Sequence, residues 1–227
     1  MRRFLVLAVL FWIFTSLALW ADTTQFTDSF GRADASNLGA SWDTVTSADA
    51  ISISGNQAQV TNLSTDTAET VNAVAINNDQ WAQVTIRALT GTAGVANRAG
   101  VLVRAATPAQ TWYACVAQLA GAAFTTRIEY RVAGTLTASS SENSVTWAPN
   151  DVLKVGVVGT TITCYRNGST TGMPTPLTDA NLTGGRPGIF LVNQDALSSS
   201  AVDDFSAGDF TTPSSATTRA LLVGVGQ

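Results

Sequence analysis

Short apolar stretches follow one another along most of the chain. From Ile51 to Phe190 they are rich in Val, Ile, Thr and aromatic residues, and each ends at Gly, Asn, Asp or Pro. Such punctuation is typical of β-strands. The pattern predicts eleven strands, at 51–53, 58–63, 71–76, 81–89, 100–105, 112–119, 125–132, 152–158, 161–165, 188–192 and 201–208.

Helical periodicity is missing from the sequence after residue 21, because no stretch keeps the 3.6-residue period over three turns. Strands without helices predict an all-β fold in which two antiparallel sheets pack as a sandwich. Within 81–89 the even positions from Ala82 to Ala88 are apolar and the odd positions from Gln83 to Arg87 are polar. This alternation predicts a half-buried strand with its even positions in the core.

Two tight turns are predicted near the middle of the second half. Val158-Gly159-Thr160-Thr161 fits a two-residue hairpin, and Asn167-Gly168 is a strong short-range turn signal. The segment 152–172 is therefore predicted to be a meander of adjacent strands.

The amino terminus has the layout of a secretory signal. Arg2 and Arg3 precede an apolar run from residue 4 to 21 whose only polar members are Thr15 and Ser16. We expect residues 1–21 to be a cleaved signal peptide, which makes the protein secreted or extracytoplasmic. If cleavage fails, the segment 4–21 is long enough to tether the domain to a membrane.

The rest of the chain divides into a domain and a tail. Residues 22–210 suit one β-sandwich, since such domains reach 200–250 residues. Residues 211–227 form a linker rich in Thr, Ser and Pro that leads into a short apolar tail. The tail could be a frayed end, an extra edge strand or a strand donated to a partner.

The composition excludes several classes of function. The chain has no His, which removes Ser-His-Asp and Cys-His catalysis and every His-ligated metal site. Its single lysine, Lys154, and its net charge of −4 argue against a nucleic-acid partner. Without residues 1–21 the basic residues fall from 12 to 10 against 16 acidic ones, so we expect no binding to anionic membranes after cleavage.

Cys115 and Cys164 are the only cysteines, and both lie in predicted strands. An even number of cysteines in an exported chain favours one disulfide. It would close a loop of about 50 residues and contribute about 3–4 kcal/mol in the chain-entropy model. The alternative is two free cysteines that pack as small hydrophobic side chains.

A set of motifs resembles the concanavalin A-like lectin/glucanase superfamily, whose domains are laminin-G-like jelly rolls. The first is Asp28-Ser-Phe30-Gly-Arg32-Ala-Asp34 followed by Leu38-Gly39 and Trp42. The others, in order, are Val101-Leu-Val-Arg104-Ala105, Trp112-Tyr113, Tyr130-Arg131-Val132, Asp151-Val-Leu-Lys154 through Tyr165-Arg-Asn167-Gly168, Gly185-Arg186-Pro187-Gly188 and Val202-Asp203-Asp204-Phe205. The resemblance covers nearly the whole chain after residue 21. It implies a two-sheet antiparallel jelly-roll sandwich with a concave and a convex sheet, its first and last strands adjacent.

The catalytic motif of the glucanase branch is missing. That branch has a strand with Glu, Asp and Glu at alternate positions, whereas here Glu69, Glu129 and Glu142 are the only glutamates and lie far apart in sequence. A retaining glycosidase needs two carboxyl groups about 5–5.5 Å apart. The resemblance therefore implies a non-catalytic module.

Candidate ligand-binding residues follow from the resemblance, which places a groove on the concave sheet. Its outward stripe would include Arg87, Arg104, Arg127 and Glu129, and one of Trp112 and Tyr113 would face outward to stack on a sugar. Period-two spacing puts Glu129 between Arg127 and Arg131, which favours the ionised carboxylate. The alternative for Glu129 is an exposed cross-strand charge ladder.

Calcium is conceivable where the two ends of the domain meet. Asp28, Asp203 and Asp204 could supply carboxylates there, together with Asp34 and Asp209. Calcium needs six to eight oxygen ligands. Asp28 and Asp34 could instead cap turns and pair with Arg32. We expect no cofactor, with structural calcium as the alternative.

The sequence thus favours an exported, non-catalytic module that binds a glycan on its concave sheet. A structural or decoration subunit of a virion or cell surface, with the tail as its attachment, is the second interpretation. A glycoside hydrolase with an atypical carboxylate site is the third.

Overall fold

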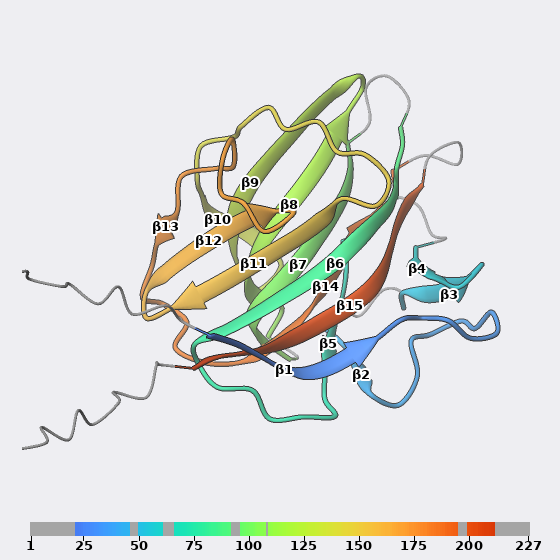
Figure 1. The fold of residues 1–227 in the computed structure, drawn as a ribbon, viewed down its shortest axis with the longest axis horizontal. Helices are drawn as coiled ribbons and strands as arrows, with labels where there is room; N and C mark the ends of the chain where they lie inside the picture. Colours follow the sequence, from blue (N-terminus) through green and yellow to red (C-terminus); the bar gives the residue numbers. More distant parts are fainter. Residues whose placement is uncertain are drawn as a thin grey trace, which may run out of the picture.

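The computed structural model describes residues 21–45, 50–60, 66–91, 96–107, 109–194 and 199–211. Within these ranges the chain forms two antiparallel sheets, one behind the other, and contains no helix (Figure 1). The predicted all-β, two-sheet jelly-roll sandwich is confirmed. The predicted signal peptide, apart from Ala21, and residues 212–227 of the predicted tail lie outside the described residues.

One sheet has eight strands. Its order is β13 (Leu177–Thr178), β12 (Thr161–Arg166), β11 (Val152–Val158), β6 (Gln80–Leu89), β15 (Ser200–Thr211), β4 (Gln57–Gln59) and β3 (Ser52–Ser54), and β1 (Ala21–Asp28) also pairs with β15. The first and last strands of the described chain are therefore neighbours, as the resemblance implied (Figure 1).

The other sheet has seven strands. Its order is β10 (Thr135–Ser139), β9 (Ala123–Val132), β8 (Thr111–Ala120), β7 (Ala96–Ala106), β14 (Arg186–Val192), β5 (Thr67–Val71) and β2 (Trp42–Thr44). Among the described residues no helix is long and apolar enough to cross a membrane.

Most predicted strands are present, and the differences fall on polar segments. The strands β1, β2, β10 and β13 were not predicted, because β1, β2 and β13 lack apolar alternation and β10 has only two alternating apolar residues, Leu136 and Ala138. The predicted strand at 71–76 is wrong in position, since the strand is Thr67–Val71 and only Val71 is common to both. All five residues of β5 are buried although three of them are Thr or Glu, so burial here does not follow side-chain polarity.

The core lies between the sheets, and period-two alternation fills it from both sides. Ala82, Val84 and Ile86 of β6 are buried there, as the alternation predicted. The hairpin between β11 and β12 turns at Gly159 and Thr160, also as predicted. Asn167-Gly168 forms a second turn, but this turn returns the chain only to an isolated bridge between Arg166 and Ser169.

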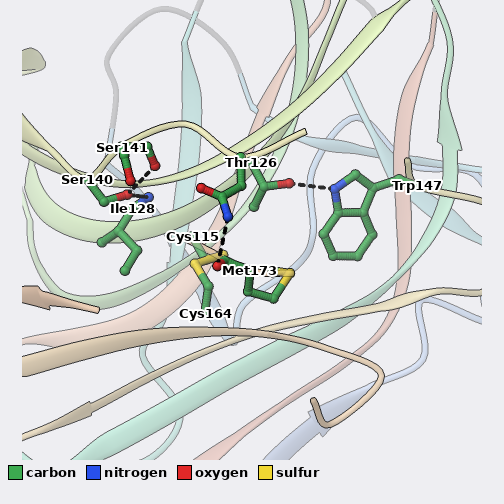
Figure 2. Close-up of a disulfide and its surroundings, with 9 residues drawn as sticks. Cys115, Thr126, Ile128, Ser140, Ser141, Trp147, Cys164 and Met173 are labelled. Carbon is green, nitrogen blue, oxygen red and sulfur yellow. Dashed lines mark hydrogen bonds between the residues drawn. A yellow bond between two sulfur atoms is a disulfide. The ribbon is translucent and has the colours of Figure 1, made fainter. Parts of the chain in front are cut away.

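The predicted disulfide is present. Cys115 of β8 and Cys164 of β12 are bonded across the core, with their Cα atoms 5.6 Å apart (Figure 2). Beside it, Trp147 donates a hydrogen bond from Nε1 to the hydroxyl of Thr126 over 2.8 Å. The disulfide therefore links the two sheets in the middle of the sandwich.

Candidate functional site

A group of charged side chains, which we call the ionic row, lies on the outer face of the seven-stranded sheet. The odd positions of β9 point to this face, because Ile128 and Tyr130 point into the core. The row consists of Asp66, Arg98, Arg127, Glu129, Arg131 and Glu142.

Glu129 is the centre of the ionic row. Its Oε1 lies 2.6 Å from Arg127 Nη2, and its Oε2 lies 2.7 Å from Arg131 Nε. Each arginine also forms an ion pair with a more exposed carboxylate: Arg127 with Glu142, and Arg131 with Asp66. Each charge near the centre of the row thus has a partner of opposite sign.

The carboxyl group of Glu129 is ionised. Burial alone would raise its pKa, but the charges and hydrogen bonds of Arg131 and Arg127 outweigh burial and hold the pKa below its usual value. This agrees with the expectation from the spacing. The alternative of an exposed charge ladder is wrong, because Glu129 is 0% exposed. A carboxylate held ionised in this way is poorly suited to act as a general acid.

Trp112 and Tyr113 point to opposite faces of β8. Trp112 lies on the outer face, 6.0 Å from the ring of Phe190, and Tyr113 lies in the core. Both are 0% exposed. The Tyr113 hydroxyl donates to Asp179 and accepts from the backbone of Leu182, and burial raises its pKa to about 12. Neither ring offers a free face to a ligand in this structure.

Arg87 and Arg104 do not join the ionic row. Arg87 lies on β6 of the other sheet, where its Nη2 is 2.9 Å from Asp203. Arg104 lies at an irregularity of β7 with φ of 51°, and it donates to the carbonyl oxygens of Asn78 and Leu182. Of the predicted ligand-binding residues, only Trp112, Arg127 and Glu129 therefore share one outer face.

The acidic residues proposed for calcium hold protein partners. Asp28 accepts hydrogen bonds from Trp42 Nε1, from the Phe30 backbone and from Arg32, which is the capping role given above as the alternative. Burial opposes these bonds, but they lower the pKa of Asp28. Asp203 pairs with Arg87. No group of three potential ligands within the described ranges could hold a metal ion.

The remaining predicted acidic residues are also engaged. Asp34 accepts from the backbone of Gly55, and Asp209 accepts from the backbone and amide of Asn77. Asp204 lies 3.7 Å from Arg87 and is exposed. These carboxylates stabilise the turns and strand ends where the two termini of the domain meet.

A second candidate site lies on the outer face of the eight-stranded sheet, where polar side chains of three adjacent strands are aligned. Thr27 of β1 pairs with Ser206 of β15, and Ser206 pairs with Gln83 of β6. Directly paired residues project from the same face of a sheet. Phe205 and Ala207 point into the core, so these three side chains point outward. We call them the polar row.

An open pocket of about 540 Å³ lies over the polar row. It is lined by Thr27, Asp28, Ser29, Gln83, Asp204, Phe205 and Ser206. The pairing of β15 with β6 is interrupted between Asp203 and Ser206, and Asp204 has a φ of 48° in this bulge. The left-handed region is uncommon for residues other than Gly, and Asp is among those that adopt it most readily.

The polar row carries several hydrogen-bonding groups. Within the part of the chain that the structure describes, the side chains of Thr27, Ser206 and Gln83 make no hydrogen bond with one another or with other residues. Two hydroxyl groups and one amide supply both donors and acceptors. Sequence reasoning named Gln83 as outward but missed the site, because the match of Thr27 to Ser206 depends on a register between residues 179 positions apart.

Beside the polar row lies the Lys154 cluster, which consists of Lys154, Asp22, Trp81, Tyr165 and Phe210. Lys154 Nζ lies 4.5 Å from the ring centre of Trp81, 5.5 Å from that of Phe210 and 5.8 Å from that of Tyr165. It also forms an ion pair with Asp22 of β1. Trp81 is buried, whereas Tyr165 and Phe210 are partly exposed.

Comparison of the sequence with family models and with curated proteins finds no match. Solved structures do match, at low identity.

A carbohydrate-binding module, CBM66 from Bacillus subtilis, is 16% identical with a TM-score of 0.51, and the match covers 78% of this chain and 98% of that module. The catalytic domain of an endo-1,3-β-glucanase from Thermotoga petrophila is 8% identical with a TM-score of 0.55, and the match covers 86% and 100%. The CBM2 module of the evolved Dit protein of Lactobacillus casei phage J-1 is 11% identical with a TM-score of 0.54, and the match covers 83% and 95%. These similarities show that the chain has the concanavalin A-like jelly-roll fold.

Proposed function

We propose that this protein is a non-catalytic glycan-binding module that holds a sugar in the pocket over the polar row. The observation that carries the proposal is the set of unpaired polar side chains of Thr27, Ser206 and Gln83 on three adjacent strands beneath an open pocket. A sugar offers closely spaced hydroxyl groups that both donate and accept. Side chains of this kind, fixed on a rigid sheet, suit such a ligand.

The ionic row is less suited to bind a ligand. Its central carboxylate is fully buried, and its arginines already hold carboxylate partners. A ligand there would have to break charge-assisted hydrogen bonds, which are stronger than those it could form through neutral hydroxyl groups. The binding role of Arg127, Glu129 and Trp112 stays a prediction that the test below can examine.

A glycoside hydrolase is the weaker alternative. General acid catalysis requires a carboxyl group that is protonated at the working pH. Asp28 lines the pocket, but Arg32 and Trp42 lower its pKa. We therefore expect a bound oligosaccharide to be recovered intact after prolonged incubation. Shorter products in that incubation would favour the hydrolase.

A place on a virion or cell surface is compatible with glycan binding. The phage J-1 module has the same fold and is itself described as a carbohydrate-binding module of Dit. The role of a structural or decoration subunit is therefore not opposed to the proposed one.

The test is a glycan-array screen followed by titration calorimetry with a glycan that binds. Gln83→Ala and Thr27→Ala should each weaken binding about fivefold to tenfold, because each removes about 1 kcal/mol of hydrogen bonding. Thr161→Ala is the matched control for Thr27→Ala. Both threonines are exposed on outer positions of the same sheet, but Thr161 lies on β12, away from the pocket.

Thermal unfolding of each variant checks that it folds. Unchanged affinity in folded Gln83→Ala and Thr27→Ala proteins would show that the polar row is not the site. A loss confined to Arg127→Ala would move the site to the ionic row. No saturable binding to any glycan would overturn the proposed function.

A further inference from the structure

The polar row continues across the sheet beyond the pocket. Gln83 of β6 pairs with Lys154 of β11, and Lys154 pairs with Tyr165 of β12. Five strands therefore present one outer row in register, which we call the extended row. It runs from Thr27 through Ser206, Gln83 and Lys154 to Tyr165. Neighbouring strands are about 4.8 Å apart, so this row is about 19 Å long.

From this row we infer an extended site, whose ligand is a linear, uncharged oligosaccharide lying across the strands with one end in the pocket. The inference rests on the proposed function and names the class of glycan. A row of this length exceeds a single sugar ring.

The two halves of the row differ in chemistry. The half at Thr27, Ser206 and Gln83 is made of hydrogen-bonding groups, and the half at Lys154 and Tyr165 is made of a partly exposed ring and an aliphatic stem. Sugar rings have polar edges and apolar C–H faces. An aromatic ring binds such a face by stacking, so Tyr165 provides a stacking position two strands away from Gln83.

Lys154 leaves the middle of the row open to an uncharged ligand. Its ammonium group points toward Trp81 and Phe210 and pairs with Asp22. The ring of Phe210 lies over Gly156, where a Cβ atom would come within 2.8 Å of it. The charge is thus held among the rings of Trp81, Phe210 and Tyr165, and Lys154 offers no unpaired ammonium group to a ligand.

Charge decides between neutral and acidic glycans. Asp28 and Asp204 line the pocket, where Asp28 pairs with Arg32 and Asp204 lies 3.7 Å from Arg87, and the cation of Lys154 is paired with Asp22. A carboxylate or sulfate on the ligand would find no unpaired cation in the row and would lose its hydration without a compensating ion pair. The site therefore favours neutral sugars.

The test uses calorimetric titration with cello-, laminari- and manno-oligosaccharides of increasing length, and with oligogalacturonides as the acidic series. We expect affinity for one neutral series to rise with length and then to level off once the row is filled, with no binding of the acidic series. Tyr165→Ala should weaken binding of the longest member about tenfold. It should leave the shortest binding member unchanged, and Tyr165→Phe should retain the wild-type affinity.

Gln83→Ala is the complementary variant, because it should weaken binding at every length. Affinity that does not depend on length, or an equal effect of Tyr165→Ala on short and long ligands, would overturn the extended site and leave the proposed function standing. Preference for the acidic series would overturn the charge argument. No saturable binding to any glycan would overturn the proposed function as well.

Discussion

Cys115 of the seven-stranded sheet is bonded to Cys164 of the eight-stranded sheet, and this disulfide cross-links the two layers through side chains (Figure 2). The bond closes a loop with a sequence separation of 49 and so restricts the unfolded chain. We predict that Cys115→Ala/Cys164→Ala lowers the free energy of unfolding by about 3–4 kcal/mol. Urea unfolding of the two proteins measures this difference. An unchanged midpoint would mean that the bond does not stabilise the fold.

Glu129 should be the most sensitive charge on the ionic row. Glu129→Gln removes the carboxylate that faces both Arg127 and Arg131 and leaves two buried guanidinium groups with fewer partners. Breaking a buried ion pair in this way costs about 3–5 kcal/mol. Glu142→Gln is the control, because Glu142 is 47% exposed and pairs with Arg127 from the surface. Glu142→Gln should lower the free energy of unfolding, measured in urea, by less than about 1 kcal/mol. Equal losses for the two variants would contradict the central role of Glu129.

The carboxylate of Glu129 should also make the folded protein less stable as the pH falls. The pKa of Glu129 lies below 4.5 in the folded protein and near its usual value in the unfolded chain. Its stabilising effect is therefore complete above the unfolded pKa and is lost as the pH falls through the folded pKa. Urea midpoints measured from neutral pH into acid should fall more steeply for the wild-type protein than for Glu129→Gln. Parallel curves would contradict this linkage.

Much of the fold could be predicted from local pattern, whereas the site could not. The alternation in β6 and the turn at Gly159 are set by neighbours in sequence, and both were predicted correctly. The strand β1 has one apolar side chain, Phe26, between its polar residues, so its strand character comes from pairing with β15. The polar row depends on that same long-range register.

The error at the ionic row has a different cause. Period-two spacing correctly placed Glu129 between Arg127 and Arg131 on one face. Spacing within one strand shows which residues share a face but not whether that face is covered, and Trp112 and Glu129 are completely buried although they lie on the outer face of a sheet. Arg87 was assigned to the wrong face because its strand belongs to the other sheet.

Lys154 should stabilise the eight-stranded sheet mainly through the aromatic rings around its ammonium group. Its ammonium group contacts the rings of Trp81, Tyr165 and Phe210 and pairs with Asp22, and its side chain is 13% exposed. Lys154→Met keeps an apolar stem but removes the charge, so we expect a loss of about 1–2 kcal/mol in the free energy of unfolding. Asp22→Asn should cost less than about 1 kcal/mol, because Asp22 is 44% exposed. Equal losses in urea unfolding would mean that the ion pair, and not the rings, holds Lys154.

Glu69 should make the protein less stable as the pH rises. It is 2% exposed on β5, its Oε1 accepts a hydrogen bond of 2.7 Å from the backbone of Ile51, and burial raises its pKa to about 7. Below pH 4.5 the carboxyl group is protonated in the folded and the unfolded protein, and no stability is lost. Between pH 4.5 and 7 it ionises in the unfolded chain first, so stability falls, and above 7 the loss is complete at about 3 kcal/mol. Glu69→Gln should therefore be as stable as the wild type at pH 4.5 and more stable at pH 8 in urea unfolding. A difference that stays constant between these two pH values would show that Glu69 does not titrate with folding.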